Sequence, residues 1–196
     1  PWVARREGIA HGTLERQTRA SQVLGNQRDV YLYRPPGWKP GAAGQGLLVL
    51  FDAHAYTRQV PTPTLLDNLI ADGMIAPTAA LIIANPTDMS RQVELPPNPQ
   101  FARFIAQELM PWAKTQGLSA TAARTVVAGS SYGGLASAYL GLQHPELFGN
   151  VLSLSGSYWW APDGEEPGWL TREYVKAPRA PLRALTPTMA SRPAAR

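Results

Sequence analysis

The stretch Val126-Val127-Ala128-Gly129-Ser130-Ser131-Tyr132-Gly133-Gly134 decides the fold. An apolar, β-branched run leads into a Gly-x-Ser-x-Gly pentad, and an alanine-rich helical pattern follows it. This order is typical of a nucleophile elbow, in which a buried strand turns sharply into a helix and presents a serine at the apex. The spacing makes Ser131 the predicted nucleophile and Ser130 a bystander. A glycine–serine turn in an ordinary strand–helix connection is the alternative, and the flanking patterns favour the elbow.

Strand and helix patterns alternate on both sides of this stretch. Residues 2–27 are polar and indicate an edge strand or an ordered arm. Further strands are expected at residues 29–34, 47–51, 80–84 and 151–155, and helices at 64–70, 101–112 (kinked or restarted at Pro111) and 135–142. Continuous apolar strands are typical of parallel sheets that are buried on both faces. The pattern therefore predicts an α/β fold with a three-layer, mostly parallel, α/β-hydrolase-type sheet.

The last twenty residues are different in kind. Residues 177–196 consist mainly of alanine, proline and arginine, and prolines at 178, 181, 187 and 193 prevent a long helix. We therefore expect residues 1–176 to form one incomplete α/β-hydrolase-type domain and residues 177–196 to be a disordered tail. The sheet would then lack its last strand or strands and a helix, and the exposed edge at Val151–Ser155 would be prone to association.

Composition and charge exclude several classes of function. The chain of 196 residues has a net charge of +4, and its last twenty residues hold four arginines and no acidic residue. The rest is roughly neutral, so no basic patch indicates a nucleic-acid partner. No apolar run is long enough for a membrane span, and no cysteine is present for a disulfide or thiolate site. We expect no cofactor and no metal. A start at Pro1 without methionine indicates a fragment, a processed form or an incomplete reading.

The residues around Ser131 can supply two of the three parts of a serine hydrolase site. Such a site needs a nucleophile, N–H donors for the oxyanion, and a histidine oriented by a carboxylate. The backbone N–H of Tyr132, at the start of the helix, is one expected donor. The loop after residues 47–51 is expected to supply the second donor through the backbone of His54.

The histidine that should act as base has no well-placed candidate. In this fold the acid and the histidine follow the serine in the chain. Only His144 follows Ser131, and it is expected at the far end of the helix, about 1.5 Å away per intervening residue. His54 is expected to act through its backbone. The acidic residues of the loop 163–166 are expected to be solvated charges.

From about Gln22 to about Trp169 the chain resembles the enterochelin (enterobactin) esterase family, among the esterase-D-like α/β-hydrolases. Segments that carry the resemblance are residues 23–28, 33–37, 91–98 (with Arg-x-x-Glu-Leu), 128–135, 144–149 and 155–160. The resemblance implies cytoplasmic hydrolysis of ester bonds in a small-molecule ester such as a ferric catecholate siderophore. Ser131 would form the acyl-enzyme, with Tyr132 and His54 as backbone oxyanion donors. The residues implied to meet the substrate are Arg58, Arg91, Trp159 and Trp160.

Three departures from the family pattern leave other readings open. Asp52-Ala53 stands where the family has Asp-Gly, and neither the family's amino-terminal domain nor its carboxy-terminal acid and Gly-Gly-His-Asp-like segment has a counterpart. We therefore expect a truncated or frame-shifted esterase with low turnover. One alternative is a non-catalytic relative that binds a catecholate or acyl ligand. Another is an esterase for short-chain or aromatic-acid esters.

Overall fold

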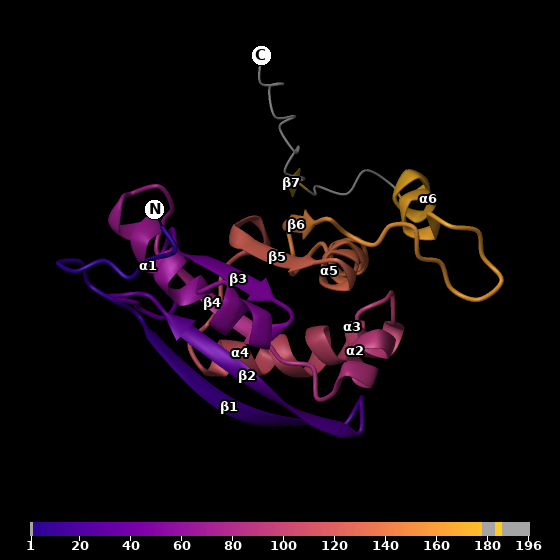
Figure 1. The fold of residues 1–196 in the computed structure, drawn as a ribbon, viewed down its shortest axis with the longest axis horizontal. Helices are drawn as coiled ribbons and strands as arrows, with labels where there is room; N and C mark the ends of the chain where they lie inside the picture. Colours follow the sequence, from indigo (N-terminus) through magenta and orange to yellow (C-terminus); the bar gives the residue numbers. More distant parts are fainter. Residues whose placement is uncertain (1, 178–182, 186–196) are drawn as a thin grey trace, which may run out of the picture.

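A computed structural model describes residues 2–177 and 183–185, which are built around one mixed sheet (Figure 1). The seven strands follow the spatial order β1-β2-β4-β3-β5-β6-β7. Their bounds are β1 Thr13–Ser21, β2 Asn26–Arg34, β3 Gly46–Leu50, β4 Thr78–Ile83, β5 Thr125–Ser130, β6 Asn150–Leu154 and β7 Arg183–Leu185. β1, β2 and β4 pair antiparallel, and β4, β3, β5, β6 and β7 pair parallel. The predicted α/β class with a mostly parallel sheet is confirmed.

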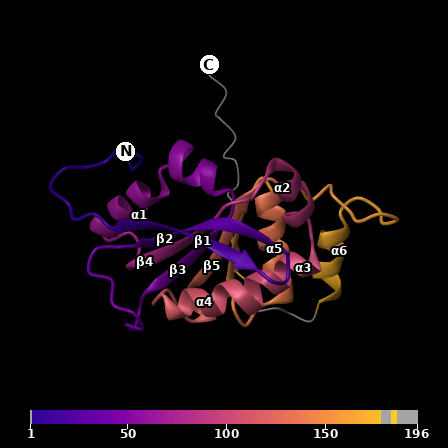
Figure 2. The same cartoon turned by 90° about the horizontal axis from the view of Figure 1, so that it is seen from below.

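Helices cover both faces of the sheet, which gives three layers (Figure 2). The helices are α1 Thr62–Ala71, α2 Asp88–Glu94, α3 Pro99–Arg103, α4 Met110–Thr115, α5 Tyr132–Gln143 and α6 Trp169–Lys176. Shorter turns are the π-helical η1 Ala55–Gln59 and η2 Phe104–Leu109, and the 3₁₀ turn η3 Ala122–Arg124. Pro111 lies in the first turn of α4, directly after η2, so the expected restart of the helix is confirmed.

Side chains on successive strand positions enter two separate cores, because strand residues alternate between faces. The larger core joins Leu47, Val49 and Val127 to α3, η2, α4 and α5. The smaller core joins Leu50 and Ala128 to α1. Successive residues of β3 and β5 therefore enter different cores, and both faces of these central strands are buried. This explains their continuous apolar sequences.

Besides the short turns η1 and η3, two helices and one strand were not expected from the sequence. Helix α2 has few apolar residues, and helix α6 follows a polar loop. The strand is β7, which pairs with β6 in the register Asn150↔Arg183 to Leu152↔Leu185. The expectation of an unpaired β6 edge is therefore wrong over residues 150–152. The rest of the predicted disordered tail, residues 178–182 and 186–196, lies outside the described residues. Within the described part of the chain, no helix has the length and apolar character needed to span a bilayer.

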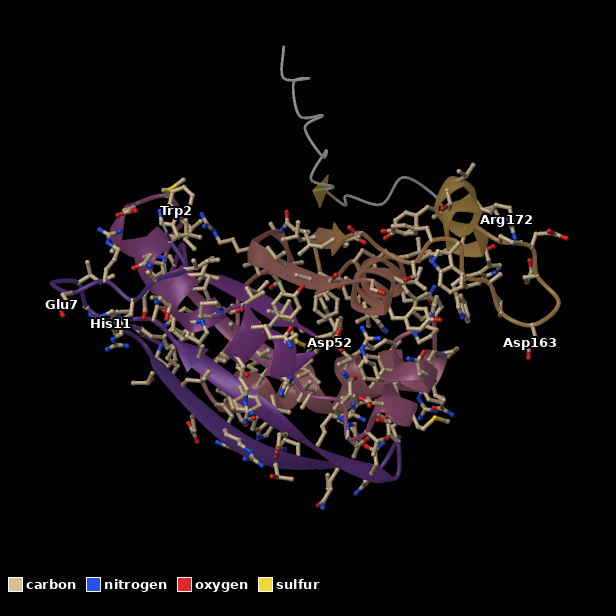
Figure 3. The ribbon with its side chains drawn as sticks, viewed as in Figure 1. Trp2, Glu7, His11, Asp52, Asp163 and Arg172 are labelled. Carbon is tan, nitrogen blue, oxygen red and sulfur yellow. The ribbon has the colours of Figure 1, made fainter. Side chains whose placement is uncertain are left out.

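An amino-terminal arm packs on α1 beside β2 (Figure 3). Asn68 donates to the backbone oxygens of Trp2 and Ala4 at 2.6 and 2.9 Å. The next anchor is Asp67, whose Oδ2 lies 3.1 Å from His11 Nδ1 and whose Oδ1 accepts from Tyr33 Oη at 2.5 Å. The arm thus fixes α1 against the sheet through buried polar contacts.

Tyr33 should make the protein lose stability at alkaline pH. Its burial, together with its hydrogen bond to Asp67, raises the pKa of Tyr33 above the ordinary tyrosine value. Above about pH 10 the unfolded chain releases this proton while the folded chain keeps it, so stability present below that pH is progressively lost. The slope per such group is at most about 1.4 kcal/mol per pH unit. Urea unfolding at a series of alkaline pH values measures the free energy of unfolding. This free energy should decline less steeply with pH in Tyr33→Phe than in the wild type, and identical slopes would contradict the prediction.

Candidate active site

Ser131 lies at a sharp turn between β5 and α5. Its backbone has φ 56° and ψ −120°, in a region that side-chain-bearing residues rarely occupy. Such strain persists only where the surroundings impose it, and it concentrates at functional sites. The predicted nucleophile elbow therefore has the expected backbone: strand, strained serine, helix.

The glycines at 129 and 133 allow this turn because their backbones nearly touch. A Cβ built on Gly129 would lie 2.5 Å from the carbonyl carbon of Gly133 and 2.8 Å from its Cα. A Cβ on Gly133 would lie 3.2 Å from Asp52 Oδ2. The pentad therefore needs glycine at both positions for steric reasons, because a side chain at either one would push the strand and the helix apart.

Gly129→Ala should destabilise the protein and distort the elbow. Because the added methyl meets rigid backbone, we expect a loss of about 3 kcal/mol in the free energy of unfolding, at the upper end for overpacking. Gly164→Ala is the matched control: no atom lies within 4 Å of its built Cβ, although φ is +83°. An alanine at position 164 should therefore lower the free energy of unfolding by roughly 1–2 kcal/mol, which is the cost of its left-handed backbone alone. Chemical denaturation measures both, and equal losses would contradict the steric account.

The Ser131 hydroxyl has one described side-chain partner. Its Oγ lies 3.2 Å from Ser157 Oγ, in the loop after β6. The same loop holds the Ser131 backbone, since Ser131 N donates to Leu154 O at 3.0 Å and Ser157 N donates to Ser131 O at 3.2 Å. Ser157 is buried, whereas Ser131 is exposed. Contacts from the loop after β6 therefore hold Ser131 on one side, and its other side is open.

The open side of Ser131 is a cavity of about 670 Å³ at the carboxyl ends of β3, β4 and β5. This is where ligands bind in open α/β sheets. The lining residues include Asp52, His54, Tyr56, Asn85, Asp88, Arg91 and Ser131. Burial and the charge of Asp52 raise the pKa of Tyr56, while a hydrogen bond with Ser130 acts in the opposite direction. The volume suits a small organic ligand.

Two backbone segments at the cavity can present N–H donors to an oxyanion. Tyr132 is the first residue of α5, so its N–H has no acceptor one turn back and points out at the positive end of the helix. His54 lies in the loop after β3, immediately before η1, and lines the cavity. Of the two predicted donor residues, His54 lines the cavity that holds Ser131, whereas Tyr132 directly follows Ser131 but is not among the lining residues.

Beside these donors, Arg91 of α2 binds Asp52 in a fork. Arg91 Nε donates to Asp52 Oδ1 at 2.6 Å, and Nη2 donates to Oδ2 at 2.9 Å. Asn85 Nδ2 donates to the same Oδ1 at 2.8 Å. The hydrogen bonds with Asp52 raise the pKa of Arg91 further, so the guanidinium stays charged. The centroid of the Tyr132 ring lies 5.9 Å from Arg91 Cζ.

The other residues predicted to meet substrate, Arg58, Trp159 and Trp160, are not among the residues that line the cavity. Trp159 is exposed, and its ring centroid lies 6.0 Å from that of Tyr132. Trp160 instead packs edge to face against Trp169, and both are partly buried against the larger core. Arg58 is exposed on η1 and is not among the residues that line the cavity. Trp159 is thus the predicted aromatic residue that is available beside the elbow.

The three histidines of the chain are separated by the fold. His144 is the C-cap of α5, as expected, and its Nδ1 lies 3.0 Å from Glu146 Oε1. His11 pairs with Asp67 on the arm. His54 alone lines the cavity, and Ser131 Oγ has no hydrogen bond to a histidine among the described residues. The loop with Asp163 is exposed and projects away from Asp52, so its acidic residues are solvated as expected (Figure 3).

Sequence reasoning missed Ser157, Asn85 and the role of Asp52 as a partner of Arg91. Ser157 lies 26 residues from Ser131, and nothing in its own Ser-Gly-Ser-Tyr context indicates that contact. Asp52 and Asn85 each follow the end of a predicted buried strand, and parallel strands bring such positions to one edge of the sheet. That placement was the available signal for both.

Comparison with known families and structures agrees with this geometry. Residues 21–186 match the family described as "Putative esterase". The iron(III) enterobactin esterase of Escherichia coli K12 is 39% identical over 132 residues, which are 67% of this chain and 33% of that protein. The corresponding enzyme of Dickeya dadantii is 37% identical over 141 residues, 71% of this chain and 32% of that protein.

A solved structure shows the same arrangement of elements. The enterobactin esterase from Shigella flexneri, solved in the presence of enterobactin, is 34% identical with a TM-score of 0.78. The match covers 88% of this chain and 45% of that chain. This chain spans about a third of the length of the curated relatives named above.

Proposed function

Because the chain belongs to the esterase family that includes the iron(III) enterobactin esterases, we propose that it carries the nucleophile half of a siderophore-type serine ester hydrolase. The observation that supports this most strongly is Ser131, strained at φ 56° beside a cavity at the ends of the parallel strands. The proposed substrate is a catecholate siderophore ester such as ferric enterobactin, and the proposed location is the cytoplasm.

In the proposed reaction, Ser131 Oγ attacks the ester carbonyl and forms a tetrahedral intermediate. The backbone N–H groups of Tyr132 and His54 receive the negative oxygen. Collapse releases the alcohol and leaves an acyl-enzyme, which water then hydrolyses. The Oγ proton must pass to a base, and no histidine hydrogen-bonds Ser131 Oγ within the described ranges. We therefore propose low turnover for the chain as it stands.

The substrate side of the proposal rests on aromatic and basic residues. Trp159 and Tyr132 stand next to one another and offer faces on which a catechol ring can stack. Arg58 and Trp160 remain predicted substrate residues from the family resemblance. Arg91 also lines the cavity, but the side of its guanidinium that faces Asp52 is engaged.

Three esters distinguish the proposed function from its alternatives. The chain is incubated with ferric enterobactin, methyl ferulate and 4-nitrophenyl butyrate, and the products are separated by liquid chromatography. We expect the catecholate ester to have the highest kcat/KM, although all the rates are low. Preference for either other ester would replace the proposed substrate. Tight binding of ferric enterobactin without hydrolysis, unchanged in Ser131→Ala, would make the chain a binding protein.

A further inference from the structure

Arg91 is placed to shape the site rather than to read substrate charge. Its two hydrogen bonds to Asp52 run in parallel, which fixes the orientation of both groups as well as their charges. The Arg91 and Asp52 side chains are 25% and 13% exposed, so the pair is partly shielded from water and screened less than a surface pair.

Asp52 in turn is the first residue of the loop that contains His54. Its φ of 58° is unfavourable for an L-residue, so contacts must hold it there. Its backbone oxygen accepts from the N–H groups of Ala55 and Tyr56 at 2.9 and 3.2 Å. Its carboxylate accepts from Asn85 beyond β4. Asp52 therefore ties the loop to the edge of the sheet.

The same carboxylate faces the start of α5. A Cβ built on Gly133 would lie 3.2 Å from Asp52 Oδ2, so the oxygen rests against the helical turn that carries Tyr132. One side chain thus stands between the two backbone segments that present the expected oxyanion donors. A change in its position would change the distance between these segments.

Residues that follow Arg91 in the chain fix α2 on the sheet. One helical turn later, Glu94 forms a buried double hydrogen bond with Arg28 of β2, at 2.8 Å from each guanidinium nitrogen. Leu95, the next residue, is fully buried. The Arg-x-x-Glu-Leu segment therefore fixes α2 on the sheet with its Glu and Leu, and directs its Arg toward Asp52.

We propose that Arg91 is a positioning residue, which holds Asp52 and through it the loop at His54 in the geometry that receives the oxyanion. The inference deepens the proposed function and rests on it. Misplacing a catalytic group by about 1 Å can reduce a rate about 10²-fold. Loss of the Arg91–Asp52 contact should therefore affect the chemical step. An arginine that bound the anionic catecholate directly would affect ligand affinity instead.

A double-mutant cycle on the full chain separates these roles. The rate at which a fluorophosphonate phosphonylates Ser131 is measured in imidazole buffer for wild type, Arg91→Met, Asp52→Asn and the double variant. We expect each single variant to react about 10²-fold more slowly, as for loss of one oxyanion donor. The double variant should be within about threefold of the slower single variant, because both act through one contact.

Binding of 2,3-dihydroxybenzoyl-serine provides the second readout. Its dissociation constant should change by less than about threefold in Arg91→Met, since the interaction lost acts on the chemical step. Arg91→Lys should react as slowly as Arg91→Met, because a lysine keeps the charge but not the fork. Arg103→Met, on the exposed face of α3, is the matched control for loss of a surface arginine.

Several outcomes would overturn the role. Additive rate losses in the double variant, or full rescue by lysine, would contradict action through the Asp52 fork. Weakened binding with an unchanged phosphonylation rate would assign Arg91 to ligand contact. If Arg91→Met does not fold, as judged by thermal unfolding, the isosteric Asp52→Asn and Arg91→Lys carry the same cycle. A wild-type chain that is not phosphonylated at all would overturn the proposed function together with this role. Normal wild-type labelling with unaffected variants would overturn this role alone.

Discussion

The chain is expected to hydrolyse ferric enterobactin at least about 10³-fold more slowly than the iron(III) enterobactin esterase of Escherichia coli K12 assayed beside it, because removal of one triad member typically costs that much or more. The structure provides the reason at Ser131. Its Oγ meets Ser157 Oγ, and no described histidine hydrogen-bonds it. The residual rate is expected to come from the proposed oxyanion donors and from substrate binding.

Added imidazole should restore part of this activity. A diffusing base can take the proton from Ser131 Oγ, and we expect a concentration-dependent increase of up to about 10²-fold, the lower end for a positioned base. Ser131→Ala should abolish the increase, whereas Ser130→Ala should retain it. A fast reaction without imidazole would contradict the missing base. If His54→Ala lost as much hydrolytic activity as Ser131→Ala, the His54 imidazole would be the base.

Replacing Glu94 by leucine should destabilise the fold by about 3–5 kcal/mol, the usual cost of leaving a buried charge unpaired. The partner, Arg28, has a side chain with no exposed area, and Glu94 is 6% exposed. Arg28 also stacks over Phe101 and Phe104, with its Cζ 5.6 and 4.7 Å from their ring centroids. Without Glu94 the guanidinium would remain in this apolar setting with Asn26 as its described partner.

Two further variants test whether the buried charge is the cause. Arg28→Met combined with Glu94→Leu should recover much of the loss, since apolar replacement of a buried pair is often neutral. Glu173→Ala, which removes the exposed pair with Lys176 on α6, should cost no more than about 0.5 kcal/mol. Urea unfolding followed by circular dichroism measures all of them. A small effect in Glu94→Leu, or a double variant as unstable as the single one, would contradict the account.

The elbow and the layers could be predicted from sequence because they depend on local order and periodicity. The run into Gly129 and the apolar runs of β3 and β4 specify buried parallel strands, and those strands place the loop after β3 beside Ser131. Only sequence neighbours and a period of two are needed for that inference.

The partners within the site could not be predicted in the same way. Arg91 was assigned to substrate from the family resemblance, and an arginine at the end of a loop is equally compatible with a structural role. Its pairing with Asp52, 39 positions away, depends on α2 folding against the sheet. That helix has exposed Met89 and Val93, so periodicity does not reveal it. The usable signal was its capping box, in which Thr87 and Ser90 exchange hydrogen bonds.

The end of the sheet shows a further limit of compositional reasoning. Residues 183–185 lie in a segment rich in alanine, proline and arginine, yet they pair with β6. Three residues can complete a parallel ladder through backbone hydrogen bonds alone, and these depend little on side-chain type. Composition predicts whether a segment can build its own core, but not whether an existing sheet edge will recruit it.

The most direct measurement of the central claim identifies the residue that becomes covalently modified. The chain is treated with a fluorophosphonate in imidazole buffer and digested with trypsin, which releases residues 125–172 as one peptide containing Ser130, Ser131 and Ser157. Fragmentation by tandem mass spectrometry should place the adduct on Ser131. An adduct on Ser130 or Ser157, or no adduct after prolonged incubation, would contradict the assignment of Ser131 as the nucleophile.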